Sequence, residues 1–163
     1  MEDNTIEQDV GNLLLSLRTT IAVAESCTGG LICHRLTNVS GSSDYLDRGV
    51  VSYSNRSKIE ILGVPERVIQ ENGAVSEACV RAMATGIKGL AGTDLGFAVS
   101  GVAGPTGGTA EKPVGTVYMA LAWNEDVKCW KHLFEGSREE IKWKASQQAL
   151  MLIQDHLLAR VHP

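Results

Sequence analysis

The sequence lacks the features that mark membrane, secreted and metal-binding proteins. Its apolar runs are far shorter than a membrane span, and the acidic start MEDN does not resemble a signal or transit peptide. Four cysteines occur without a C-x-x-C pair, which predicts neither a zinc knuckle nor a disulfide framework: Cys27, Cys33, Cys79 and Cys129. We therefore expect a soluble, cytoplasmic protein with reduced thiols, no metal and no membrane partner.

An excess of positive charge is also missing. The chain has 19 acidic and 15 basic residues, a formal net charge of -4, so no global attraction to nucleic acid is expected, although a local basic pocket remains open. Hydrophobic residues make up 44% and charged residues 21% of the 163, which is typical of a globular domain long enough to bury a core. We expect one domain over residues 1–163.

Hydrophobic periodicity predicts helices alternating with strands and then an antiparallel strand pair. The predicted strands cover residues 20–24, 49–53 (within the segment 45–53), 95–100, 114–123 and 127–134. The predicted helices cover residues 5–18, 31–36, 56–62, a short segment opening at Pro65, 76–90 and 137–160, with caps at Asn4 or Thr5, Asn55, Ser76 and Ser137. This order predicts a mixed, partly parallel sheet with helices on both faces, a three-layer α/β/α sandwich.

A serine follows the first predicted strand, in the stretch AESCTGG of residues 24–30. Ligands of open α/β sheets bind beyond the carboxyl ends of the strands. A turn that begins a helix offers free N–H groups and the positive end of the helix dipole, which suit an oxyanion or a phosphate. Ser26 is thus a candidate nucleophile. From spacing alone, a helix cap at Ser26 or Thr28 is the simpler interpretation.

A nucleophilic serine needs a base, and the usual signatures are missing. Ala24 and Thr28 stand where a G-x-S-x-G elbow has glycine. No histidine lies in a recognisable triad or H-E-x-x-H setting: His34, His132, His156 or His162. A desolvated lysine can act instead, because burial lowers its pKa. Lys58, in the first turns of a predicted helix, is the candidate base, and a solvated surface lysine is the alternative.

Two further features belong to the candidate site. Cys27 is a rival nucleophile, because a helix N-terminus lowers the pKa of a thiol, but it has no evident histidine partner and ranks below Ser26. The glycine-rich stretch SGVAGPTGGT of residues 100–109 follows a predicted strand, and its glycines would let the backbone approach an anion. It is neither a Walker A loop nor a clean G-x-G-x-x-G. A flexible connection is the alternative.

Three stretches together resemble the CinA C-terminal domain family, whose active members are the PncC-type nicotinamide-nucleotide amidases. They are AESCTGG (24–30), YSN (53–55) with Lys58, and GVAGP (101–105) through KPVGTV (112–117). The likeness covers nearly the whole chain in the same order. Larger CinA proteins carry an additional N-terminal domain, so we expect a stand-alone version. The chain departs from many relatives at Thr106, where they have glycine, which could alter loop geometry or substrate fit.

The resemblance implies cofactor-free hydrolysis of nicotinamide mononucleotide to nicotinate mononucleotide and ammonia, in bacterial pyridine-nucleotide salvage. It assigns the nucleophile to Ser26, the base to Lys58 and a relay to Tyr53. Backbone N–H groups of residues 27–30 or of the glycine loop would hold the oxyanion, while that loop, Thr109 and Arg138 would hold the phosphate. The predicted substrate contacts are Cys27, Thr28, Gly29, Gly30, Asn55, Gly101, Ala103, Gly104, Gly107, Gly108, Thr109 and Arg138. Relatives of this type often self-associate, so a homo-oligomer is expected.

Two other functions remain open. One is a non-catalytic nucleotide-binding or regulatory module, with competence-associated DNA uptake or repair as its cellular context. The Ser26, Tyr53 and Lys58 trio argues against it, because a pure binder needs no such groups. The other is an amidase that acts on a different nucleotide or amide.

Overall fold

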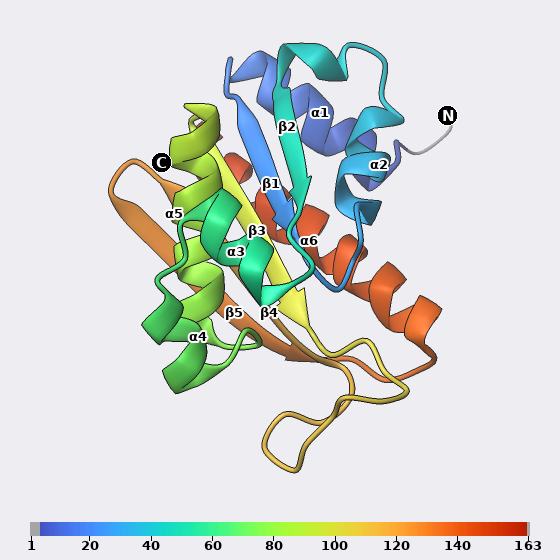
Figure 1. Ribbon diagram of the computed structural model, residues 1–163. Helices are drawn as coiled ribbons and strands as arrows, with labels where there is room; N and C mark the ends of the chain where they lie inside the picture. The colour runs from blue at the N-terminus through green and yellow to red at the C-terminus, as the bar shows by residue number, and fades with distance from the viewer. Residues whose placement is uncertain (1–3, 163) are drawn as a thin grey trace.

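A five-stranded mixed sheet lies between two layers of helices in the computed structural model, which describes residues 4–162 (Figure 1). The strands are β1 (Ile21–Glu25), β2 (Leu46–Val51), β3 (Leu95–Gly101), β4 (Thr116–Trp123) and β5 (Asp126–Leu133). The helices are α1 (Ile6–Ser16), α2 (Leu31–Thr37), the 3-10 turn η1 (Ser42–Asp44), α3 (Asn55–Leu62), α4 (Glu66–Asn72), α5 (Glu77–Ala91) and α6 (Arg138–Val161).

The strand order is β2-β1-β3-β4-β5. β1 pairs in parallel with both β2 and β3, whereas β4 and β5 add an antiparallel pair beside β3. Glu25, at the end of β1, is in register with Val51 of β2 and Val99 of β3. The carboxyl ends of the three parallel strands therefore meet at one edge of the sheet.

The two faces of the sheet carry side chains of different size. In β1, Ile21 and Val23 point into the core formed with α1, α2 and α6, whereas Ala22 and Ala24 point into the core formed with α3, α4 and α5. The alternation has the period of two that a strand imposes. The alanine face admits α5 at short range, since a Cβ on Gly96 of β3 would lie 2.3 Å from a backbone oxygen of α5.

The predicted fold class is confirmed, because helices cover both faces of a mixed sheet. The predicted caps Thr5, Ser76 and Ser137 are also confirmed. The predicted N-cap of α3 was wrong. Ser54 caps this helix instead of Asn55, and its side chain accepts from the Ser57 N–H. Extended backbone at Ser54 explains this, since the capping residue precedes the first helical one.

Several strand ends differ from the expected ones by one to three residues. β2 covers Leu46–Val51, so it begins before residue 49 and ends before Ser52 and Tyr53. β4 begins at Thr116 rather than 114, because the Gly115 N–H turns to bond the Val102 carbonyl outside the ladder. β5 begins at Asp126, so the turn at residues 124–126 is tighter than expected. Among residues 4–162, no helix is both long enough and apolar enough to cross a bilayer.

The contact between α3 and α5 gives a test of this packing. A Cβ on Gly86 would lie 1.9 Å from the carbonyl oxygen of Leu62, at the end of α3. We expect Gly86→Ala to reduce the free energy of unfolding by about 1–3 kcal/mol through overpacking. Gly89→Ala is the matched control on the same helix, where nothing lies within 4 Å of the added Cβ. It should stabilise the protein by about 0.5–1 kcal/mol, and urea denaturation measures both. Equal effects at the two positions would contradict the described packing.

Candidate active site

The candidate site lies where the three parallel strands end. Ser26 follows β1, Ser52 follows β2, and Ser100 and Gly101 end β3. The Ser26 N–H donates to the Val99 carbonyl at 3.1 Å, so the residue after β1 continues the sheet before the chain turns toward α2. This is the edge at which ligands of such sheets bind.

Lys58 of α3 points into this edge and is 1% exposed. Its Nζ lies 2.9 Å from Ser26 Oγ, 2.7 Å from the Ser52 carbonyl oxygen and 3.1 Å from the Tyr53 carbonyl oxygen. The interpretation of Lys58 as a solvated surface lysine is therefore wrong. Ser26 itself is 7% exposed, so the pair is largely withdrawn from bulk water.

The three neighbours of Lys58 suit a neutral amine. Burial lowers the pKa of Lys58 from its ordinary value, because desolvation penalises the charged form. Burial is the leading cause of this lowered pKa. A neutral amine has two N–H groups and one lone pair. The carbonyls of Ser52 and Tyr53 can only accept. In the neutral form they take the two N–H groups and the lone pair faces Ser26 Oγ, whereas in the charged form Nζ donates to all three oxygens.

A cavity of about 270 Å³ opens beside Ser26 and Lys58. Its walls include many of the predicted site residues, brought together from five segments of the chain: Ser26, Cys27, Tyr53, Asn55, Lys58, Gly101, Ala103, Gly104, Gly107 and Arg138. The other lining residues are Ala74, Val75, Ser100, Val102 and Thr106. Sequence reasoning missed Ala74 and Val75, since the turn between α4 and α5 was assigned only as a helix stop.

Five predicted contact residues do not line this cavity: Thr28, Gly29, Gly30, Gly108 and Thr109. The Thr28 hydroxyl is turned inward and donates to Glu25 Oε1 at 2.6 Å. Thr109 closes a local turn, in which its hydroxyl accepts from the Lys112 N–H and its own N–H donates to the Lys112 carbonyl. Turn formation within the loop therefore explains the side chain of Thr109 without a ligand.

Arg138, at the start of α6, joins two walls of the cavity. Its Nη1 donates to the Gly104 carbonyl and its Nη2 donates to the Tyr53 hydroxyl, each at 2.8 Å. A guanidinium has five N–H groups, so donors remain for a ligand. The Tyr53 side chain is 58% exposed, and within residues 4–162 its hydroxyl contacts Arg138 rather than Ser26 or Lys58. The relay role of Tyr53 stays a prediction.

The turn after Ser26 leaves several backbone donors free. The Gly29 N–H bonds the Ser26 carbonyl at 3.0 Å, whereas the N–H groups of Cys27, Thr28 and Gly30 have no protein acceptor in the described part of the chain. Free backbone N–H groups beside a nucleophile are suited to binding an oxyanion. None of the four histidines lines the cavity, and no cluster of metal-ligating side chains is found over residues 4–162.

Burial disfavours Cys27 as the nucleophile. Desolvation raises the pKa of its thiol to about 12, and the nearby Glu25 charge acts in the same direction. This outweighs the lowering expected at a helix start, because a buried thiolate loses its hydration.

The raised pKa predicts a protected thiol. At pH 8 we expect iodoacetamide to alkylate Cys27 about a thousandfold more slowly in the folded chain than in urea, because only the thiolate reacts. Peptide mapping by mass spectrometry follows the modification, and the urea-unfolded chain is the control. Equal rates in the two states would restore Cys27 as a candidate.

The chain belongs to the CinA C-terminal domain family, whose model matches residues 3–157. A CinA-like protein of Syntrophus aciditrophicus is 52% identical over 163 residues, which are 99% of this chain and 39% of that protein. A CinA-like protein of Geotalea daltonii is 48% identical over 98% of this chain and 38% of its own length. The chain thus spans about two fifths of the length of these curated relatives.

Solved structures share the whole fold. A CinA superfamily protein from Klebsiella pneumoniae matches with a TM-score of 0.92 and 34% identity, over 94% of this chain and 96% of that chain. The competence/damage inducible protein CihA from Agrobacterium tumefaciens matches with a TM-score of 0.86 and 35% identity, over the same shares of the two chains.

Proposed function

We propose that this chain is an amidohydrolase that converts nicotinamide mononucleotide to nicotinate mononucleotide and ammonia. The observation that carries the proposal is the buried amine of Lys58, whose Nζ lies 2.9 Å from Ser26 Oγ. A nucleophile with a base in hydrogen-bond reach is the arrangement that acyl transfer requires. The resemblance of the three motifs to the nicotinamide-nucleotide amidases supplies the substrate.

The reaction follows from the groups in place. Ser26 Oγ attacks the carboxamide carbon while Lys58 takes the hydroxyl proton. The oxygen of the tetrahedral intermediate is held by the free N–H of Cys27, the residue of the turn that lines the cavity beside Ser26. Lys58 then gives its proton to the leaving nitrogen, and ammonia departs. Water, deprotonated by the same amine, attacks the acyl-enzyme. Lys58 then returns this proton to Ser26 Oγ as the ester bond breaks and nicotinate mononucleotide leaves.

The cavity favours a mononucleotide over a larger ligand. Its volume of about 270 Å³ is near the lower end of the range for ligand pockets, roughly 300–1,000 Å³. Arg138 at its rim provides positive charge for a phosphate. The glycines of the loop after β3 let the backbone come close to the same group. Thr106 lies in this wall, so its departure from many relatives acts on substrate fit and not on the Ser26–Lys58 pair.

The proposed reaction predicts turnover of nicotinamide mononucleotide. Purified protein mixed with nicotinamide mononucleotide should release ammonia and nicotinate mononucleotide. Ser26→Ala and Lys58→Ala should each lower kcat by about 10⁴-fold or more, because the nucleophile or its base is lost. An ammonia assay with chromatographic identification of the product measures this.

Ser16→Ala and Lys88→Ala are matched controls away from the cavity and should keep native rates. Activity that survives Ser26→Ala would exclude the serine mechanism. Nucleotide binding without turnover would instead favour a regulatory module, and faster turnover of the riboside or of free nicotinamide would favour an amidase of another specificity.

The role of Lys58 as base also predicts how kcat/KM depends on pH. Only neutral Lys58 can accept a proton, so kcat/KM should fall as the pH drops through the pKa of the folded chain. Because burial lowers that pKa, the rise of kcat/KM with pH should have its midpoint below the ordinary lysine value of about 10.4. Rates from pH 5 to 10 measure the profile, with circular dichroism at each pH to show that the chain stays folded. A pH-independent rate would contradict the assignment of Lys58 as base.

A further inference from the structure

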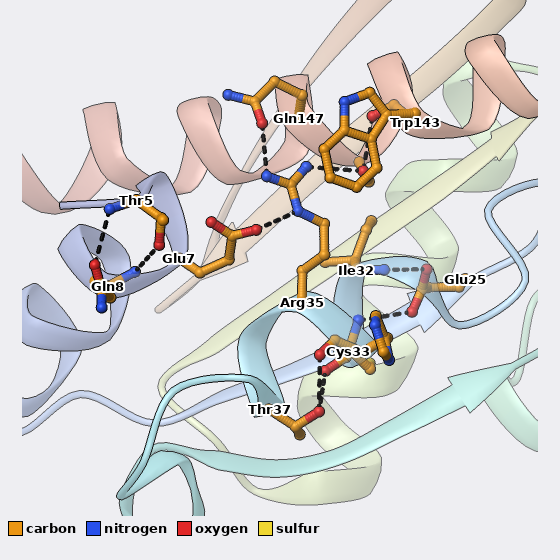
Figure 2. A network of polar contacts seen from close by, with 12 residues as sticks. Thr5, Glu7, Gln8, Glu25, Ile32, Cys33, Arg35, Thr37, Trp143 and Gln147 are labelled. Carbon is orange, nitrogen blue, oxygen red and sulfur yellow. Dashed lines mark hydrogen bonds and ion pairs between the residues drawn. The ribbon is translucent and has the colours of Figure 1, made fainter. Parts of the chain in front are cut away.

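The N-terminus of α2 is capped from an unusual direction. Its N-cap residue is Gly30, which has no side chain to bond the first amides. Glu25, the last residue of β1, takes that place (Figure 2). Its Oε1 accepts from the Ile32 N–H at 2.9 Å, and its Oε2 accepts from the Cys33 N–H at 3.1 Å. The Thr28 hydroxyl is the third donor to this carboxylate, and it bonds Oε1.

This carboxylate changes the electrostatics expected at the turn. Glu25 is 0% exposed, and all its side-chain partners are donors, which suit an ionised carboxylate. The positive end of the α2 dipole is thus already met by a negative charge inside the protein. The N–H groups of Ile32 and Cys33 are therefore not available to a substrate anion. The free N–H of Cys27 and the Arg138 guanidinium remain at the cavity.

The backbone of Glu25 reaches the other half of the catalytic pair. Its carbonyl accepts the Ser52 N–H at 2.8 Å, and the Ser52 carbonyl is the nearest acceptor of Lys58 Nζ. One residue is therefore bonded to the helix that follows Ser26 and to the strand end that holds Lys58.

The turn between these anchors contains two glycines. Gly29 and Gly30 adopt positive φ values of 62° and 101°, a region that glycine enters freely and other residues seldom do. Two such residues, three and four positions after a nucleophile, would allow Ser26 to shift unless both ends of the turn are held. The Glu25 carboxylate holds the far end, because it grips the first turn of α2.

We propose that Glu25 is a positioning residue. Its buried carboxylate clamps the Ser26 turn between β1 and α2, and this keeps Ser26 Oγ within hydrogen-bond distance of Lys58 Nζ. The clamp replaces the glycine elbow that other serine hydrolases use. Burial raises the pKa of Cys27, and the Glu25 carboxylate acts in the same direction, so the neighbouring thiol stays protonated. The proposal rests on the proposed amidase function for its kinetic test.

Glu25→Gln keeps the volume of the side chain but cannot satisfy both amides. Whichever way the amide group is turned, its NH₂ faces the N–H of Ile32 or of Cys33. We expect kcat for nicotinamide mononucleotide to fall by roughly 10²-fold, as for a displaced catalytic group. KM should stay within about threefold, because Glu25 does not line the cavity. Thr28→Val, which removes only the hydroxyl donor, should give a smaller loss of kcat, and Thr28→Ser should restore it.

Glu7→Gln is the matched control. Glu7 of α1 also bonds helix α2: its Oε1 accepts from Arg35 Nε at 2.6 Å. This contact lies on the side of α2 that faces α6, where Arg35 also bonds Gln147 (Figure 2). The same chemical change there should lower the melting temperature but leave kcat unchanged. Native kcat in Glu25→Gln, or an equal loss of kcat in Glu7→Gln, would overturn the positioning role. If Glu25→Gln does not fold, the Thr28 pair decides: equal kcat in Thr28→Val and Thr28→Ser would overturn it.

A second readout does not depend on the amidase reaction. A fluorophosphonate forms a P–O bond with Ser26 Oγ as fluoride leaves and the hydroxyl proton passes to Lys58, and intact-mass spectrometry follows the adduct. Glu25→Gln should label at least about tenfold more slowly than the native chain and than Glu7→Gln. Native labelling without hydrolysis of the mononucleotide would remove the proposed substrate but keep the clamp testable. Equal labelling of all three would overturn the clamp, and no labelling of the native chain would overturn both proposals.

Discussion

The site depends on the burial of one amine. Lys58 is enclosed by the sheet edge, by the Ser52 and Tyr53 carbonyls and by Ser26. An ammonium there would lose most of its hydration, so the environment favours the neutral form. The small side chains on the α5 face of the sheet contribute, because α5 packs close and α3 packs on α5. Backbone packing far from the cavity thereby sets the chemistry of the lysine.

Much of the fold could be predicted, because its signals are local. Apolar stripes and caps are encoded in short stretches of sequence, and the α-helices and strands were each found within a few residues. The 3-10 turn η1 was not predicted. Strand order was less accessible. The pairing of β1 with β3, across more than 70 residues, rests on contacts that no short window contains. The swap of cap from Asn55 to Ser54 shows the usual imprecision where two adjacent residues can both cap.

The site was predictable in part for the same reason. Ser26, Lys58 and the glycine loop stand at predicted strand ends or helix starts, so topology alone suggests that they meet. Burial was not predictable, and it bears on both open questions: it favours Lys58 as a base and disfavours Cys27 as a nucleophile. The role of Glu25 was missed, since the position of a carboxylate beside a serine does not reveal that its side chain turns back under the next helix.

The cavity walls come from both helical layers and from the sheet between them. Ser26 follows the first strand, Val75 precedes α5, and Arg138 opens α6. No part of the chain shorter than nearly the whole domain contains these walls. A ligand that fills the cavity must therefore select the complete native state, and its binding free energy adds to the stability of the entire domain. Binding at the site and global folding are therefore linked equilibria, so the concentration of a ligand that fills the cavity would affect how well this chain resists heat or proteolysis.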